Sequence, residues 1–125
     1  MTLDKTIWLS GVMGLVVGDA CGVPVEFMGR EKLKENPVVD MGEYGSHEQP
    51  RGSWSDDSSM ALANLKSLHK GYDLKDIMEQ FSRWDKEEIY TPFGEVFDMG
   101  NTCNQAIRKY QLGADVKNCG MSGEH

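Results

Sequence analysis

Apolar residues recur at helical intervals along most of the chain, and no segment shows the sustained period-two alternation of a strand. Asp4 and Asp73 stand where N-cap residues begin a helix, and Gly71 and Gly113 stand where a glycine ends one. The pattern predicts an all-α fold. The expected helices cover residues 4–20, 31–35, 58–70, 73–84 and 102–112.

The first predicted helix is apolar enough to raise the question of a signal peptide or a membrane span. Its apolar run, residues 7–17, follows Asp4 and stops at Asp19. That run is shorter than the roughly 20 residues of a span, and no clean cleavage site follows it. These features favour a buried helix, with a signal peptide as the alternative, and Gly11 and Gly14 are expected to let a neighbouring helix pack closely.

Length, charge and cysteine usage narrow the class of protein. A chain of 125 residues is long enough for one domain with a core, so a single domain over residues 1–125 is expected. With 13 Lys+Arg against 20 Asp+Glu, the net charge of −7 argues against binding to nucleic acid or to an anionic membrane. Three widely spaced cysteines without a Cys-x-x-Cys pattern predict neither a disulfide framework nor a zinc site, which favours a reducing, cytoplasmic location.

A long connection without periodicity, residues 36–54, leads directly to Ser55, Asp56 and Asp57. Such connections inside a small domain are usually functional or disordered. A hydroxyl and two carboxylates are the hard oxygen ligands that Mg²⁺ and Ca²⁺ prefer. The same residue types are also ordinary N-cap and first-turn residues, and on spacing alone capping is favoured over metal binding.

Two further stretches carry polar residues at helix ends. Asp19 and Glu26 flank a Gly/Pro turn after the apolar helix, where a buried charge needs a partner. A cation would serve, and so would a backbone cap or Arg30, and the sequence leaves these alternatives open. Residues 98–102 form an N-cap sequence before the last helix. The histidines show no ligand spacing and are expected at the surface: His47, His69 and His125.

In this order, the three stretches resemble the ADP-ribosylglycohydrolase family, which includes the dinitrogenase-reductase-activating glycohydrolases. The patterns are Gly-x-x-x-Gly-Asp-Ala-x-Gly-x-Pro-x-Glu at 14–26, Gly-x-Trp-Ser-Asp-Asp-Ser at 52–58 and Asp-x-Gly-Asn-Thr at 98–102. Each pattern is weak by itself, and their order and separation make the combination specific. The resemblance implies an α-helical hydrolase that holds two Mg²⁺ ions, with Mn²⁺ as a substitute, at the centre of its helices.

The resemblance also implies roles for particular residues. Ser55, Asp56 and Asp57 correspond to metal ligands, with Ser55 where threonine is usual, and Glu26 corresponds to the glutamate that reaches the metal centre. Glu26, Asp56 and Asp57 are therefore the expected catalytic residues, with Glu26 as general base for the attacking water. The implied reaction is hydrolysis of N- or O-glycosidic linkages of ADP-ribose on proteins or small molecules, and the leaving group is not identified.

Two elements of that family have no counterpart in the 125 residues: an Asp-x-Asp motif followed by Ser or Thr, and an Asn-Gly-x-Gly-Ser substrate loop. The chain is thus expected to be the N-terminal part of the family domain and, alone, to hydrolyse little. It is also expected to expose apolar helix faces and to self-associate. A non-catalytic remnant or helical interaction module is the second interpretation. An unrelated helical domain whose acids only cap helices is the third.

Overall fold

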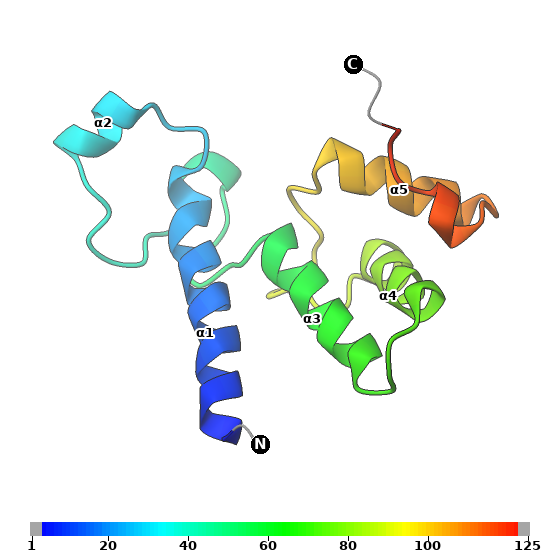
Figure 1. The fold of residues 1–125 in the computed structure, drawn as a ribbon. Helices are drawn as coiled ribbons and strands as arrows, with labels where there is room; N and C mark the ends of the chain where they lie inside the picture. Colours follow the sequence, from blue (N-terminus) through cyan, green and yellow to red (C-terminus); the bar gives the residue numbers. More distant parts are fainter. Residues whose placement is uncertain (1–3, 123–125) are drawn as a thin grey trace. The chain divides into compact units, whose positions relative to one another are not determined.

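A computed structural model describes residues 4–122, and within that range the fold is helical with no strand (Figure 1). The all-α prediction is confirmed. Tyr44 and Gln49 form an isolated bridge. The α-helices are α1 (Lys5–Gly22), α2 (Arg30–Glu35), α3 (Asp56–Leu68), α4 (Leu74–Glu87) and α5 (Asn101–Gln111). Short 3-10 helices are η1 (Val23–Val25), η2 (Gly45–His47) and η3 (Val116–Asn118).

Local capping starts two of these helices as predicted. The Asp4 carboxylate accepts a hydrogen bond from the Thr6 amide at 3.0 Å, and Asp73 accepts from two amides in the first turn of α4. The N-cap of α5 is Gly100, which lies within the predicted stretch 98–102, and that end has no side-chain cap hydrogen bond. Helix α3 begins two residues earlier than expected, which places Asp56 and Asp57 in its first turn.

The chain divides into two compact units, the first ending at Ser58 and the second beginning at Ser59. In the first unit, α1 leads directly into η1, and η2 packs against η1. The first turn of α3 completes this unit. Its most buried side chains gather near the end of α1 and the start of α3: Ala20, Val23, Ser53, Ser55 and Ser58. The expectation of a single domain over residues 1–125 stays a prediction.

Helix α1 is apolar on every side, and the described residues leave much of it exposed. Exposed fractions from 44% to 64% are found at Ile7, Trp8, Leu9, Met13, Leu15 and Val17. A Cβ added at Gly11 or Gly14 would meet no atom within 4 Å, so within the described residues of the first unit no helix packs closely there. By length and composition, residues 5–25 could cross a membrane, a test that soluble core helices and signal sequences also pass. Self-association through the exposed face stays a prediction.

The second unit is built on a core that α4 and α5 share. Trp84 of α4 and Ile107 of α5 are each 1% exposed, and Ala63 of α3 is fully buried. Leu74, at the start of α4, lies outside this core and is 42% exposed. Packing between the two helices is completed by polar contacts at their edge.

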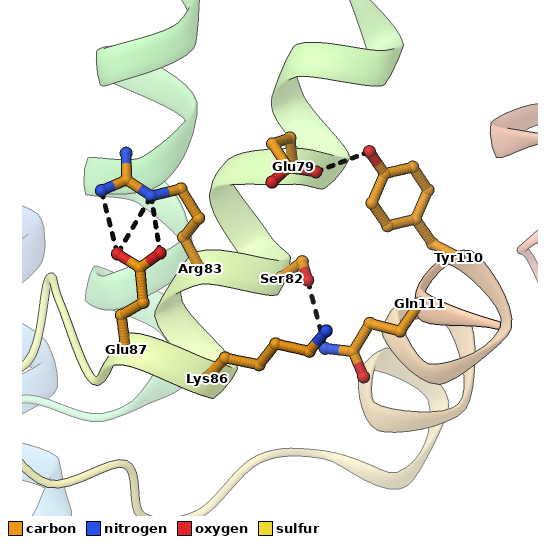
Figure 2. Close-up of a pocket in the computed structure, with 7 residues that line it drawn as sticks. All are labelled: Glu79, Ser82, Arg83, Lys86, Glu87, Tyr110 and Gln111. Atoms are coloured by element: carbon orange, nitrogen blue, oxygen red, sulfur yellow. Dashed lines mark hydrogen bonds and ion pairs between the residues drawn. The ribbon is translucent and has the colours of Figure 1, made fainter. Parts of the chain in front are cut away.

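Figure 2 shows that edge as a hollow of about 280 Å³ between α4 and α5. The Tyr110 hydroxyl donates to the Glu79 carboxylate at 2.7 Å, and the Gln111 amide donates to Ser82 at 3.2 Å. The guanidinium of Arg83 is paired with Glu87 one turn later on the same helix, at 2.9 Å. The Tyr110 and Gln111 contacts connect α5 to α4, whereas the Arg83–Glu87 pair lies within α4.

The contact with Glu79 predicts an unusual titration of Tyr110. The hydrogen bond to the carboxylate, then burial, raises the pKa of Tyr110 from 10.0 to about 12. The folded state therefore retains a proton that the unfolded chain loses near pH 10. This contribution to stability is complete below pH 10 and is lost as the pH rises to about 12. We expect tyrosinate absorbance to show a late component that disappears in Tyr110→Phe.

The exposed Tyr72 provides the control, because Tyr72→Phe is expected to leave the late component in place. If Tyr110→Phe and the wild-type protein have the same titration curve between pH 10 and pH 12, the Glu79 contact does not exist in solution.

Candidate functional site

Asp19, in the last turn of α1, accepts four hydrogen bonds through its carboxylate. Its Oδ1 accepts the hydroxyl of Ser55 at 2.7 Å. Its Oδ2 accepts the backbone amides of Ser55 and Ser58 at 2.9 and 3.1 Å, and the Ser58 hydroxyl at 2.5 Å. Both serines are buried, at 5% and 0% exposure. One carboxylate thus binds the segment that begins α3.

This contact is a helix cap supplied from a distant part of the sequence. The amide of Ser58 is one of the first-turn N–H groups that have no partner inside a helix, and a side chain at the position of Ser55 would normally accept it. Asp19 does so instead, and the positive end of α3 favours its negative charge. Of the partners that the sequence left open for Asp19, the structure shows the backbone cap rather than Arg30.

The cap changes what Ser55 can do. Its hydroxyl hydrogen is donated to Asp19, and the Ser58 amide that its oxygen would otherwise cap is bound by Asp19 as well. A hydroxyl has one hydrogen and two lone pairs, which remain for another partner. Ser55 also lines a hollow.

The hollow has a volume of about 240 Å³ and lies wholly within the first unit. It is lined by Asp19, Gly22, Val23, Val25, Glu26, Ser55 and Asp57. Its polar groups are three carboxylates and one hydroxyl, which are hard oxygen donors of the kind that suits Mg²⁺. Carboxylates gathered on one surface create a negative potential that attracts cations. The donor set therefore fits the Mg²⁺ that the resemblance implies.

The structure brings together three of the four predicted ligands. Ser55, Asp57 and Glu26 line the same hollow, and Asp19 joins them. Asp56 is not among the lining residues of the described chain, and it makes contacts of its own. The assignment of these residues as ligands, Asp56 included, stays a prediction.

The Glu26 carboxylate contacts His47, a histidine that was expected at the surface. Its Oε2 lies 2.6 Å from Nε2 of His47, in η2. The His47 side chain is only 13% exposed, so the expectation of a surface histidine is wrong. No sequence signal indicated this pair, because His47 lies in the long connection and meets Glu26 only after that connection folds back over 21 positions.

Comparisons with known proteins agree with these motifs. A sequence profile described as ADP-ribosylglycohydrolase matches residues 7–124. An ADP-ribosylarginine hydrolase, Tri1, of Serratia proteamaculans (strain 568) is 36% identical over 111 residues, which are 87% of this chain and 29% of the relative. An ADP-ribosyl-[dinitrogen reductase] glycohydrolase of Rhodospirillum rubrum is 36% identical over 113 residues, which are 82% of this chain and 34% of the relative.

A solved structure described as an ADP-ribosylglycohydrolase-related protein complex has a similar fold, with a TM-score of 0.62 and 31% sequence identity. The match covers 86% of this chain and 34% of the solved chain. The chain therefore spans about a third of the length of the proteins that it resembles.

The capping role of Asp19 predicts a large loss of stability on its removal. In Asp19→Ala, two serine hydroxyls and two amides lose their acceptor, and water can replace it only partly because both serines are buried. We expect the free energy of unfolding to fall by about 2–4 kcal/mol, measured by urea denaturation.

Asp4→Ala is the matched control, because Asp4 caps α1 through a single exposed contact. Its cost is expected to be about 1 kcal/mol or less. Equal losses of unfolding free energy in the two variants would show that Asp19 contributes no more to stability than an ordinary N-cap residue.

Proposed function

Since the chain belongs to the ADP-ribosylglycohydrolase family, we propose that the hollow lined by Asp19, Glu26, Ser55 and Asp57 forms part of a magnesium-dependent hydrolase site. The observation that carries this proposal is the convergence of Glu26 from the first motif with Ser55 and Asp57 from the second. These residues lie about 30 positions apart in the sequence, and they border one hollow of about 240 Å³.

The proposed substrate is a protein that carries ADP-ribose. This class is supported by the names of the two relatives, which refer to ADP-ribosylarginine and to ADP-ribosylated dinitrogen reductase. An arginine linkage is the first substrate to test, and a small molecule that contains ADP-ribose is the alternative. The proposed location is the cytoplasm.

The residues of the hollow have distinct proposed roles. Glu26, Ser55 and Asp57, which line the hollow, would hold the metal, and Asp56, which does not line it, would be a further ligand on the resemblance alone. The Ser55 hydroxyl is the donor in its contact with Asp19, so its lone pairs remain for a metal ion. Bound Mg²⁺ would orient the ribose hydroxyls and the water and increase the acidity of that water. Glu26 would accept the proton of the attacking water. Positive charge develops at the anomeric carbon in the transition state, and the neighbouring carboxylates would stabilise it.

Two complete magnesium ions need about 12 ligand positions, since each takes six oxygens, whereas this hollow offers only a few side-chain oxygens. Waters and substrate hydroxyls fill part of such a shell, and further carboxylates usually complete it. We therefore propose that residues 1–125 by themselves bind Mg²⁺ weakly and turn over little substrate. A non-catalytic interaction module stays the alternative function, and it predicts no metal dependence.

The metal role can be tested on the chain itself. Titration with Mg²⁺ is expected to shift the backbone amide signals of residues 55–58 in NMR spectra. We expect Asp57→Asn to raise the dissociation constant at least about 10-fold, because it removes a charged ligand, and Asp56→Asn to raise it less. Asp115→Asn changes an exposed cap in the second unit and should leave the titration unchanged. Amide shifts that persist in Asp57→Asn would remove the metal centre from this hollow.

The reaction can be tested on the full-length gene product. ADP-ribose release from an ADP-ribosylated arginine peptide is expected to require Mg²⁺ and to stop on addition of EDTA. We expect Asp57→Asn to lower kcat/KM by about 100-fold or more, because the metal no longer orients the nucleophile. Release at an unchanged rate after removal of all divalent metal would overturn the proposed mechanism, and release from a serine linkage alone would change the substrate.

A further inference from the structure

The long connection before α3 folds back onto the turn that carries Glu26. The amide of Tyr44 donates to the carbonyl of Gln49 at 2.6 Å, which closes residues 44–49 into a small loop around η2. The Ser46 hydroxyl donates to the carbonyl oxygen of Glu26 at 2.5 Å. The backbone of Glu26 is therefore hydrogen-bonded to this loop.

Gly45 allows the loop to approach so closely. Its φ of +56° lies in the left-handed region, and a Cβ built at this position would collide with the carbonyl oxygen of Pro24. Any other residue would force the two backbones apart. The backbone of the loop thus packs directly against the backbone of the turn.

This fit brings the side chain of His47 to the side chain of Glu26. Nε2 of His47 lies 2.6 Å from Oε2 of Glu26, and the imidazole also packs at 5.7 Å between ring centroids against Phe27. Because an ionised carboxylate only accepts hydrogen bonds, the imidazole N–H is the donor. The histidine side chain is 13% exposed whereas the glutamate side chain is 40% exposed, so the more buried side chain contacts the more exposed one.

We propose that His47 is a positioning residue, which holds the carboxylate of Glu26 in the orientation that the hollow requires. Its hydrogen bond occupies Oε2 and leaves Oε1 for a metal ion or an attacking water. The inference rests on the proposed function of the hollow. Ligating carboxylates in metal sites are themselves hydrogen-bonded, and loss of such a partner commonly weakens metal binding by 10 to 100-fold.

The test compares His47→Leu with His47→Gln in the 125-residue chain. Gln places an amide N–H near the position of Nε2, whereas Leu cannot donate. His69→Leu is the matched control, because His69 is an exposed histidine of the second unit. The first measurement needs no metal: three-bond couplings between the β and γ protons of Glu26 report whether its side chain keeps one rotamer. The second is the dissociation constant for Mg²⁺ from the amide shifts of residues 55–58.

We expect one rotamer of Glu26 in the wild-type chain, in His47→Gln and in His69→Leu, and averaged couplings in His47→Leu. The dissociation constant is expected to rise about 10-fold in His47→Leu and to stay within about threefold of wild type in His47→Gln. Unchanged Glu26 couplings in His47→Leu would overturn the proposal. Loss of Mg²⁺ binding in His47→Gln as large as in His47→Leu would also overturn it, because His47 would then be a ligand itself.

Asp57→Asn separates this inference from the proposed function. It is expected to weaken Mg²⁺ binding while the couplings of Glu26 stay those of one rotamer. A wild-type chain that shows no Mg²⁺-dependent shift would overturn the proposed metal centre, and the couplings would still decide whether His47 positions Glu26.

Discussion

The contact between the Asp19 carboxylate and the first turn of α3 is the interaction on which the candidate site depends. It joins the end of α1 to a segment 36 to 39 positions later, through two hydroxyls and two amides. Hydrogen bonds to a charged acceptor are about twice as strong as neutral ones, so this set can fix the start of a helix. The directions of Ser55 and Asp57 follow from that start, because both are set by the first turn of α3.

A second constraint acts on Glu26. The connection between α2 and α3 has no regular periodicity, yet it forms a closed loop that contacts the Glu26 backbone through Ser46 and its side chain through His47. Loops that carry functional groups are held by a scaffold in this way. Glu26 thus reaches the hollow from the turn after α1, and Ser55 and Asp57 reach it from the start of α3.

The sequence was sufficient for the helices and for naming three of the residues that line the hollow, and the failures have physical causes. Periodicity and the caps at Asp4 and Asp73 place the helices well, but α3 begins with polar residues that have no apolar period, so its start was expected too late. Adjacent residues on an α-helix point about 100° apart, so Asp56 and Asp57 do not both face one hollow. The contacts of Asp19 and His47 depend on how distant segments meet, which spacing along the chain does not contain.

Capping and metal binding were competing interpretations of Ser55, Asp56 and Asp57, because the same oxygen atoms suit both. The structure assigns the capping role to a different residue, Asp19. Asp19 accepts a hydrogen bond from the first-turn amide of Ser58, which Ser55 would otherwise cap. It also accepts a hydrogen bond from the Ser55 hydroxyl. The need of α3 for a cap is therefore satisfied by a carboxylate from α1. Ser55 is not required for that purpose, and both Ser55 and Asp57 line the hollow.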